Sequence, residues 1–196
     1  RYTHVVLYRA FLKIASSYSS SPSSAFLSFQ ELEPFLRYMG NYIQSLRSLI
    51  GHRKFIHPAA RILLENEKGE ILLIRRKDND QWGLIAGGLE EEEDIATCIR
   101  REVMEETGLI LQHLEAIGLS TQPERESVVY PNGDQIQYFT VVFYSQKWQG
   151  NLLQETDETT EAQFFPPDQL PHLPPNEFSS VEWLQRFKEE GKFILE

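Results

Sequence analysis

The sequence predicts a mixed α+β domain, and three observations support this fold class. The 196-residue chain is 41% hydrophobic and 12% aromatic, a composition that suits a packed core and is too apolar for a disordered chain. From residue 59 onward, short β-like runs and stretches of helical periodicity succeed one another. Their order is strand, strand, loop, helix, three strands and a last helix, which favours a central helix laid on a sheet.

Residues 1–50 are expected to form a helical extension that precedes this domain. Apolar residues recur near a 3.6-residue period over residues 2–15, and a serine-rich linker follows over residues 16–24. A second helix is expected over residues 28–50, because serine is a good N-cap at its start and glycine follows its end. We interpret the extension as a helical hairpin that packs on the main domain, residues 51–196, or on a second subunit.

The main domain is expected to open with two strands, over residues 59–65 and 70–75. Residues 66–69, Asn-Glu-Lys-Gly, lie between them, and their glycine tolerates positive φ. This spacing predicts that the two strands pair as a β-hairpin. A loop through Trp82 then leads to a pair of glycines.

The central helix is expected from Asp94 to Glu106, with Gly108 as its stop signal. Beyond it we expect strands over residues 114–121 and 135–148, linked by a turn at residues 131–134, a short strand over residues 163–165, and a closing amphipathic helix over residues 181–190.

The net charge of −10 is concentrated in two short segments. Residues 90–106 contain eight carboxylates and two arginines, and residues 155–161 contain four carboxylates and no base. A net negative chain is a poor general binder of nucleic acid, and no apolar run approaches the roughly 20 residues that span a bilayer. With a single cysteine, Cys98, and no signal-peptide pattern, the sequence favours a cytoplasmic protein without a membrane or nucleic-acid partner.

Three carboxylates of the central helix are predicted to share one face. At the helical 100° per residue, Glu102, Glu105 and Glu106 fall within an arc of about 100°, which continues the apolar stripe of the earlier turns. A solvated acidic face is the alternative, but Thr97, Arg100 and Met104 lie opposite the apolar stripe and are expected to face water. Clustered anions away from water repel one another unless a cation neutralises them, and oxygen ligands suit Mg²⁺ or Mn²⁺.

Two neighbouring features fit such a site. Arg101 lies four residues before Glu105 and can pair with it along the helix. The glycines Gly87 and Gly88 allow close backbone approach and leave backbone groups free to meet phosphate or metal, with a simple tight turn as the alternative.

This arrangement resembles the Nudix hydrolase signature, which is Gly, five residues, Glu, seven residues, Arg-Glu, an aliphatic residue, any residue, Glu-Glu, any residue, Gly and an aliphatic residue. All nine defined positions are filled, by Gly87, Glu93, Arg101, Glu102, Val103, Glu105, Glu106, Gly108 and Leu109. A chance match anywhere in the chain is expected at roughly 10⁻⁷ or below. The resemblance extends over about residues 59–171 and leaves residues 1–50 uncovered.

The resemblance implies a Nudix-type α/β/α sandwich with a mixed β-sheet. It also implies divalent-metal-dependent hydrolysis of the diphosphate linkage in a nucleoside diphosphate linked to another group, X. ADP-ribose or a nucleotide sugar is the first expected substrate, since Pro123 lies 14 residues past the motif, close to where a proline marks some ADP-ribose enzymes. The alternatives are a nucleoside triphosphate or dinucleoside polyphosphate pyrophosphohydrolase and a non-catalytic nucleotide-sensing module of the same fold.

The resemblance also assigns expected roles to individual residues. The expected ligands of Mg²⁺ or Mn²⁺ are Glu93, Glu102, Glu105 and Glu106. The expected catalytic residues are Glu105, Arg101 and Glu161, of which Glu161, or its close rival Glu158, supplies the general base from outside the motif. The expected substrate contacts are Arg75, Arg76, Gly87 and Gly88, although a solvated strand end is the alternative for the two arginines. The oligomeric state stays open, with a homodimer as one option.

Overall fold

The computed structural model describes residues 42–196. The chain divides into two compact units, Arg1–Leu49 and Ile50–Glu196. The helix expected over residues 2–15, the serine-rich linker and most of the second expected helix lie outside the described residues. Helix α3, Tyr42–Ile50, lies within the range expected for that second helix, and Gly51 follows it with a left-handed φ of 60°, which is common just past a helix end.

The second unit is built around a six-stranded mixed sheet with the order β11-β6-β8-β1-β4, in which β7 also pairs with β8. The two central strands run parallel, from Phe55 opposite Ile136 to Leu64 opposite Ser145. The strands of this sheet are β1 (Phe55–Leu64), β4 (Ile85–Gly88), β6 (Glu115–Ser120), β7 (Ser127–Val129), β8 (Gln135–Ser145) and β11 (Ile194–Leu195).

The remaining strands form two smaller sheets. Strand β2 (Ile71–Arg76) lies between β10 (Thr159–Phe165) and β3 (Trp82–Gly83), and β5 (Ile110–Leu111) pairs with β9 (Trp148–Gln149). The registers place β2 antiparallel to both of its neighbours.

The predicted hairpin of the first two strands is wrong. The turn itself forms, since Gly69 has a φ of 81° and Asn66 bonds back to Glu70, but β1 and β2 meet only at the bridge between Glu65 and Ile71. Residues 59–64 of β1 and 71–74 of β2 are buried on both faces, and each strand pairs with strands of its own sheet. A tight turn fixes where two strands meet, whereas burial decides which strands pair.

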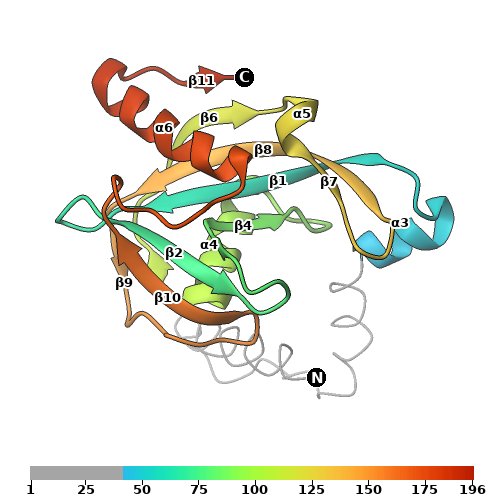
Figure 1. Ribbon diagram of the computed structural model, residues 1–196, viewed down its shortest axis with the longest axis horizontal. Helices are drawn as coiled ribbons and strands as arrows, with labels where there is room; N and C mark the ends of the chain where they lie inside the picture. The colour runs from blue at the N-terminus through green and yellow to red at the C-terminus, as the bar shows by residue number, and fades with distance from the viewer. Residues whose placement is uncertain (1–41) are drawn as a thin grey trace, which may run out of the picture. The chain divides into compact units, whose positions relative to one another are not determined.

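Helices α4 (Ile95–Thr107) and α6 (Pro175–Glu190) cover opposite faces of the central sheet (Figure 1). Side chains of β1 alternate between the two layers: Ile62 packs in the cluster that contains α4, and Leu63 packs in the cluster that contains α6. The α/β/α sandwich implied by the resemblance is therefore confirmed. Figure 1 also shows the short helix α5 (Pro123–Glu126) beside the start of α6.

Several elements differ from the sequence-based expectation. Helix α6 begins at Pro175, six residues before its expected start, because proline is well suited to a first helical turn. The expected strand over residues 135–148 ends at Ser145. Helix α5 and the short strands β3, β4, β5, β7, β9 and β11 were not predicted as separate elements. Between residues 42 and 196, no helix is both long and apolar enough to cross a membrane.

Candidate active site

Helix α4 holds the acidic residues in one fixed frame. Its N-cap is Asp94, whose Oδ1 accepts hydrogen bonds from the backbone N–H groups of Ala96 and Thr97 at 2.9 Å. Its C-cap is Gly108 with a φ of 73°. The helix therefore begins and ends beside Asp94 and Gly108, close to the bounds expected from the sequence.

The predicted facing of this helix is confirmed. Glu102 and Glu106 are buried, with 8% and 2% of their surface exposed, while Thr97 and Arg100 are exposed and Met104 is half-buried. Glu105 is half-buried at the border between the two sides. The alternative of a solvated acidic face is therefore excluded for Glu102 and Glu106.

Arg101 gathers the carboxylates around its guanidinium group. It donates from Nε and Nη2 to the two oxygens of Glu93 at 2.9 and 3.0 Å. Its Nη1 donates to Glu102 at 2.5 Å and to Glu105 at 3.1 Å. The expected pair with Glu105 is present, but Arg101 also ties the helix to Glu93 and to the backbone carbonyl of Gly88, at 3.2 Å.

Glu106 is the most buried carboxylate of the group. Its Oε2 has no hydrogen-bond partner among the described residues, and its Oε1 lies 4.0 Å from Nη1 of Arg76. Burial raises the pKa of Glu106 well above its usual value, and Arg76 only partly opposes this shift. A buried carboxylate oxygen without a partner is costly, so this oxygen is suited to a cation that is bound beside it.

The neighbouring carboxyl groups are perturbed in the same direction. Burial raises the pKa of Glu102 to about 7, against the opposing effect of Arg101. The pKa of Glu105 is also raised by burial. In both cases the negative charge of Glu158 adds to the upward shift. Crowded, desolvated anions of this kind are typical of functional sites.

Arg101 also determines how the site could accept a metal ion. In residues 42–196, no three His, Cys, Asp or Glu side chains converge in the manner of a preformed metal site. The reason is that Glu93, Glu102 and Glu105 all turn toward the guanidinium group. The donor set, four carboxylates and no nitrogen or sulfur, fits a hard divalent ion, but an ion on Glu102 has to compete with Nη1 of Arg101.

Gly87 and Gly88 lie in strand β4 and not in a turn. A Cβ on Gly87 would lie 1.9 Å from Oε1 of Glu102, and a Cβ on Gly88 would lie 2.2 Å from Nε2 of His57. Glycine is thus required because side chains approach the backbone closely, with no left-handed φ involved. Substrate contact by these two residues stays a prediction.

The structure separates the two candidate phosphate-binding arginines. Arg75 pairs with Asp80 at 2.9 Å and with Glu161 at 3.8 Å, at an exposed edge. Arg76, the next residue of β2, extends from the opposite face of the strand toward Glu106. Its Nη2 donates to the backbone carbonyl of Leu84 at 3.1 Å. Only Arg76 is therefore brought next to the carboxylates of α4.

The two candidate bases are separated in a similar way. Glu161 lies on β10 opposite Arg75 in the strand register and forms its ion pair there. Glu158 precedes the strand, and its charge raises the pKa of Glu102, Glu105 and Glu106. Glu158 therefore lies within electrostatic reach of all three carboxylates of α4.

Sequence reasoning missed Glu177, a buried carboxylate in the first turn of α6. Its Oε2 accepts the backbone N–H of Leu84 at 2.5 Å, and its Oε1 lies 3.9 Å from Nη2 of Arg76. The available signal was the pair of prolines before it, which marks a helix start and would have placed Glu177 inside the helix.

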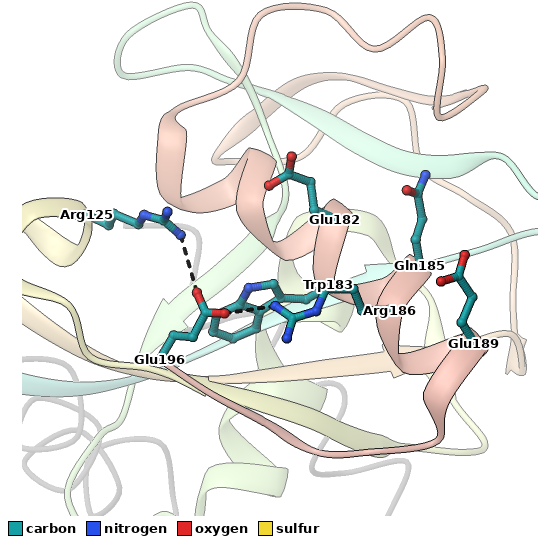
Figure 2. Close-up of a pocket in the computed structure, with 7 residues that line it drawn as sticks. All are labelled: Arg125, Glu182, Trp183, Gln185, Arg186, Glu189 and Glu196. Carbon is teal, nitrogen blue, oxygen red and sulfur yellow. Dashed lines mark hydrogen bonds and ion pairs between the residues drawn. The ribbon is translucent and has the colours of Figure 1, made fainter.

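A separate surface pocket of about 430 Å³ lies over α6, and no residue of the motif lines it (Figure 2). Figure 2 shows its two arginines, Arg125 and Arg186, turned toward Glu196, at 3.7 and 2.8 Å. Both cations are thus already paired. We therefore locate the candidate active site at α4, where buried charge is left uncompensated. The residues of the pocket are Arg125, Glu182, Trp183, Gln185, Arg186, Glu189 and Glu196.

Comparison with known proteins agrees with this location. The family model of the NUDIX domain matches residues 55–187. A protein of Methanocaldococcus jannaschii named ADP-ribose pyrophosphatase is 34% identical over 142 residues, which cover 70% of this chain and 78% of that protein. The NAD-capped RNA hydrolase NudC of Pseudomonas aeruginosa is 31% identical over 115 residues, but these cover 58% of this chain and only 37% of that protein.

The solved structures give the same fold. The MutT NUDIX hydrolase from Burkholderia pseudomallei superposes with a TM-score of 0.56 at 22% identity, and the match covers 66% of this chain and 98% of the other. At this level of identity the likeness establishes the fold, whereas the family model and the relative from M. jannaschii establish the membership. The chain belongs to the Nudix hydrolase family and is a pyrophosphohydrolase.

Proposed function

We propose that the protein hydrolyses the diphosphate linkage of ADP-ribose or of a related nucleotide sugar, with Mg²⁺ or Mn²⁺ bound by carboxylates of α4. The observation that carries this proposal is made at the buried Glu106: its Oε2 has no hydrogen-bond partner among the described residues, and its Oε1 lies 4.0 Å from the guanidinium of Arg76. The carboxylate of Glu106 would bind the metal ion, and the guanidinium of Arg76 beside it would bind the anionic substrate that the metal ion holds.

The substrate class is supported by the names of the relatives. The protein of M. jannaschii is named for ADP-ribose, and the relative from P. aeruginosa is named for an RNA capped with NAD. Both compounds contain a diphosphate that joins adenosine to a second ribose. A nucleoside triphosphate or a dinucleoside polyphosphate is the alternative substrate, and a nucleotide-sensing module without turnover is the alternative function.

Glu102 and Glu106 would be the main metal ligands, with Glu93 and Glu105 as further ones. A divalent ion there would neutralise the charge of the diphosphate and lower the pKa of a coordinated water. Arg101 holds Glu93 and Glu105 in place through its hydrogen bonds. Arg76, the one arginine of β2 next to Glu106, would bind a phosphate oxygen and offset the charge that develops during attack.

A carboxylate from outside the motif would take the proton of the attacking water. We place Glu158 in this role ahead of Glu161, because the charge of Glu158 acts on Glu102, Glu105 and Glu106, whereas Glu161 pairs with Arg75. In this step the O–H bond of the water breaks and the proton moves to the carboxylate, while the water oxygen bonds to one phosphorus of the diphosphate. The bond from that phosphorus to the bridging oxygen breaks, and the other phosphate leaves with that oxygen.

The test is a panel of ADP-ribose, nucleotide sugars, NAD, nucleoside triphosphates and dinucleoside polyphosphates with Mg²⁺, with products read by chromatography. We expect release of AMP from ADP-ribose, loss of activity in Glu106→Gln, and near wild-type activity in the control Glu91→Gln, which alters an exposed residue. Inactivity against the whole panel would contradict the proposal. Tight binding of ADP-ribose in calorimetry without turnover would favour the sensing module.

A further inference from the structure

Glu177 links the first turn of α6 to the loop between β3 and β4. Its side chain is buried, and Oε2 accepts the N–H of Leu84 at 2.5 Å. Its other oxygen, Oε1, faces Arg76, with 3.9 Å to Nη2. One carboxylate therefore serves two partners with two different oxygens.

The guanidinium of Arg76 is held between carboxylates from opposite layers of the sandwich. Nη1 lies 4.0 Å from Glu106 on α4, and Nη2 lies 3.9 Å from Glu177 on α6. The same Nη2 donates to the carbonyl of Leu84, whose N–H binds Glu177. Leu84, Glu177 and Arg76 thus form a closed set of contacts that fixes the direction of the arginine.

Gly83 makes room for this arrangement. A Cβ at this position would lie 2.9 Å from Oε2 of Glu177 and 3.2 Å from Nε of Arg76. The φ of Gly83 is not in the left-handed region, so the position is constrained by space and not by backbone conformation. Both side chains therefore pass directly over the backbone of β3.

We propose that Glu177 is a positioning residue for Arg76: it orients the guanidinium toward the diphosphate of the substrate and so couples α6 to the reaction at α4. This inference rests on the proposed function, because it assigns the diphosphate contact to Arg76. A purely structural role, as the acceptor for Leu84, would use Oε2 alone and would leave the effect of Glu177 independent of Arg76.

A double-mutant cycle separates the two roles. Glu177→Gln retains a side-chain oxygen for the N–H of Leu84 and removes the charge that faces Arg76, so we expect a fall in kcat/KM for ADP-ribose of about tenfold. Arg76→Ala should cost about 100-fold, and the double variant should be no worse than Arg76→Ala. The control is Glu182→Gln, at an exposed position of α6, which should act as wild type.

Thermal unfolding of each variant shows whether the fold is retained, and Glu177→Gln is preferred to Glu177→Ala for this reason. Losses that multiply in the double variant, or an unchanged kcat/KM in Glu177→Gln, would overturn the inference while the proposed function stands. If the wild type proves inactive, the proposed function fails, and the same cycle is measured on the Kd for inorganic pyrophosphate with Mg²⁺. Additive losses of affinity there would overturn the inference, and non-additive losses would support it.

Discussion

Arg101 binds Glu93 through two parallel hydrogen bonds, from Nε at 2.9 Å and from Nη2 at 3.0 Å. This two-point contact ties the loop before α4 to the middle of the helix. Lysine keeps the charge but cannot form both bonds at once. We therefore expect Arg101→Lys to lower kcat/KM by about tenfold or more, measured by AMP release. Arg100→Lys is the matched control, since Arg100 is exposed and donates to the backbone carbonyl of Leu111, away from Glu93; an equal loss in both variants would argue against this role.

The two arginines of β2 are expected to differ sharply in their effect on activity. Arg76→Ala removes the cation next to Glu106 and should lower kcat/KM by about 100-fold, the usual size for a lost electrostatic contact in the transition state. Arg75→Ala removes an exposed ion pair with Asp80 and should change kcat/KM by less than about threefold. A larger loss for Arg75→Ala would mean that the substrate reaches the exposed edge of the strand.

The general base is testable with two conservative variants. Glu158→Gln should lower kcat by about 10²- to 10⁴-fold with little change in KM, because proton transfer is lost and binding is kept. Glu161→Gln should lie near wild type. The reverse ranking would assign the base to Glu161, and small effects of both would place it among the carboxylates of α4. Steady-state kinetics with ADP-ribose at fixed Mg²⁺ provide the comparison.

The lack of space for a side chain at residue 88 is expected to make substitution of Gly88 destabilising. Gly88→Ala places a methyl group on the ring of His57 and should destabilise the fold by about 1–3 kcal/mol in urea unfolding. The double variant with His57→Ala should recover part of that loss, because the ring is then absent. Gly87→Ala collides with Glu102 instead, so His57→Ala should not rescue it. Rescue of both variants would show that the two clashes are not separate.

Without metal, the stability of the protein should depend on the charge of Glu102. Burial raises the pKa of this carboxyl from 4.5 to about 7, so the folded state binds its proton more tightly than the unfolded state does. The resulting stabilisation is complete below about pH 4.5 and is lost as the pH rises through 7. In EDTA, the unfolding free energy of wild type should therefore fall relative to Glu102→Gln between pH 4.5 and 8. Addition of Mg²⁺ at pH 8 should restore it, and a pH-independent difference would contradict this linkage.

The acidic helix could be predicted from sequence because its signals are local. Asp94 and Gly108 mark its ends, and the 3.6-residue period then fixes which carboxylates turn inward. The contact of Arg101 with Glu105 follows from the same period. The contact with Glu93 does not, since it depends on the path of the loop before the helix.

The partners of Arg76 lay beyond such reasoning. Its proximity to Glu106 depends on how β2 is placed relative to α4, and its proximity to Glu177 depends on the docking of α6. The same limit applies to the incorrect hairpin, where the turn chemistry was right and the pairing was decided by burial across two sheets. Local sequence patterns predict where the main helices and strands lie, whereas long-range packing decides which of their side chains meet.

Three glycines lie where a side chain of the site or of its surroundings passes close to the backbone. Gly83 lies under Glu177 and Arg76, Gly87 under Glu102, and Gly88 under His57. None of the three bears a reactive group, but a side chain at Gly87 or Gly88 would collide with Glu102 or His57, and one at Gly83 would press on the side-chain ends of Glu177 and Arg76. In a library of random variants under selection for turnover, substitutions at these three glycines should be lost as often as substitutions at the charged residues. The positions of the lost glycine variants would then outline the site without any test of its chemistry.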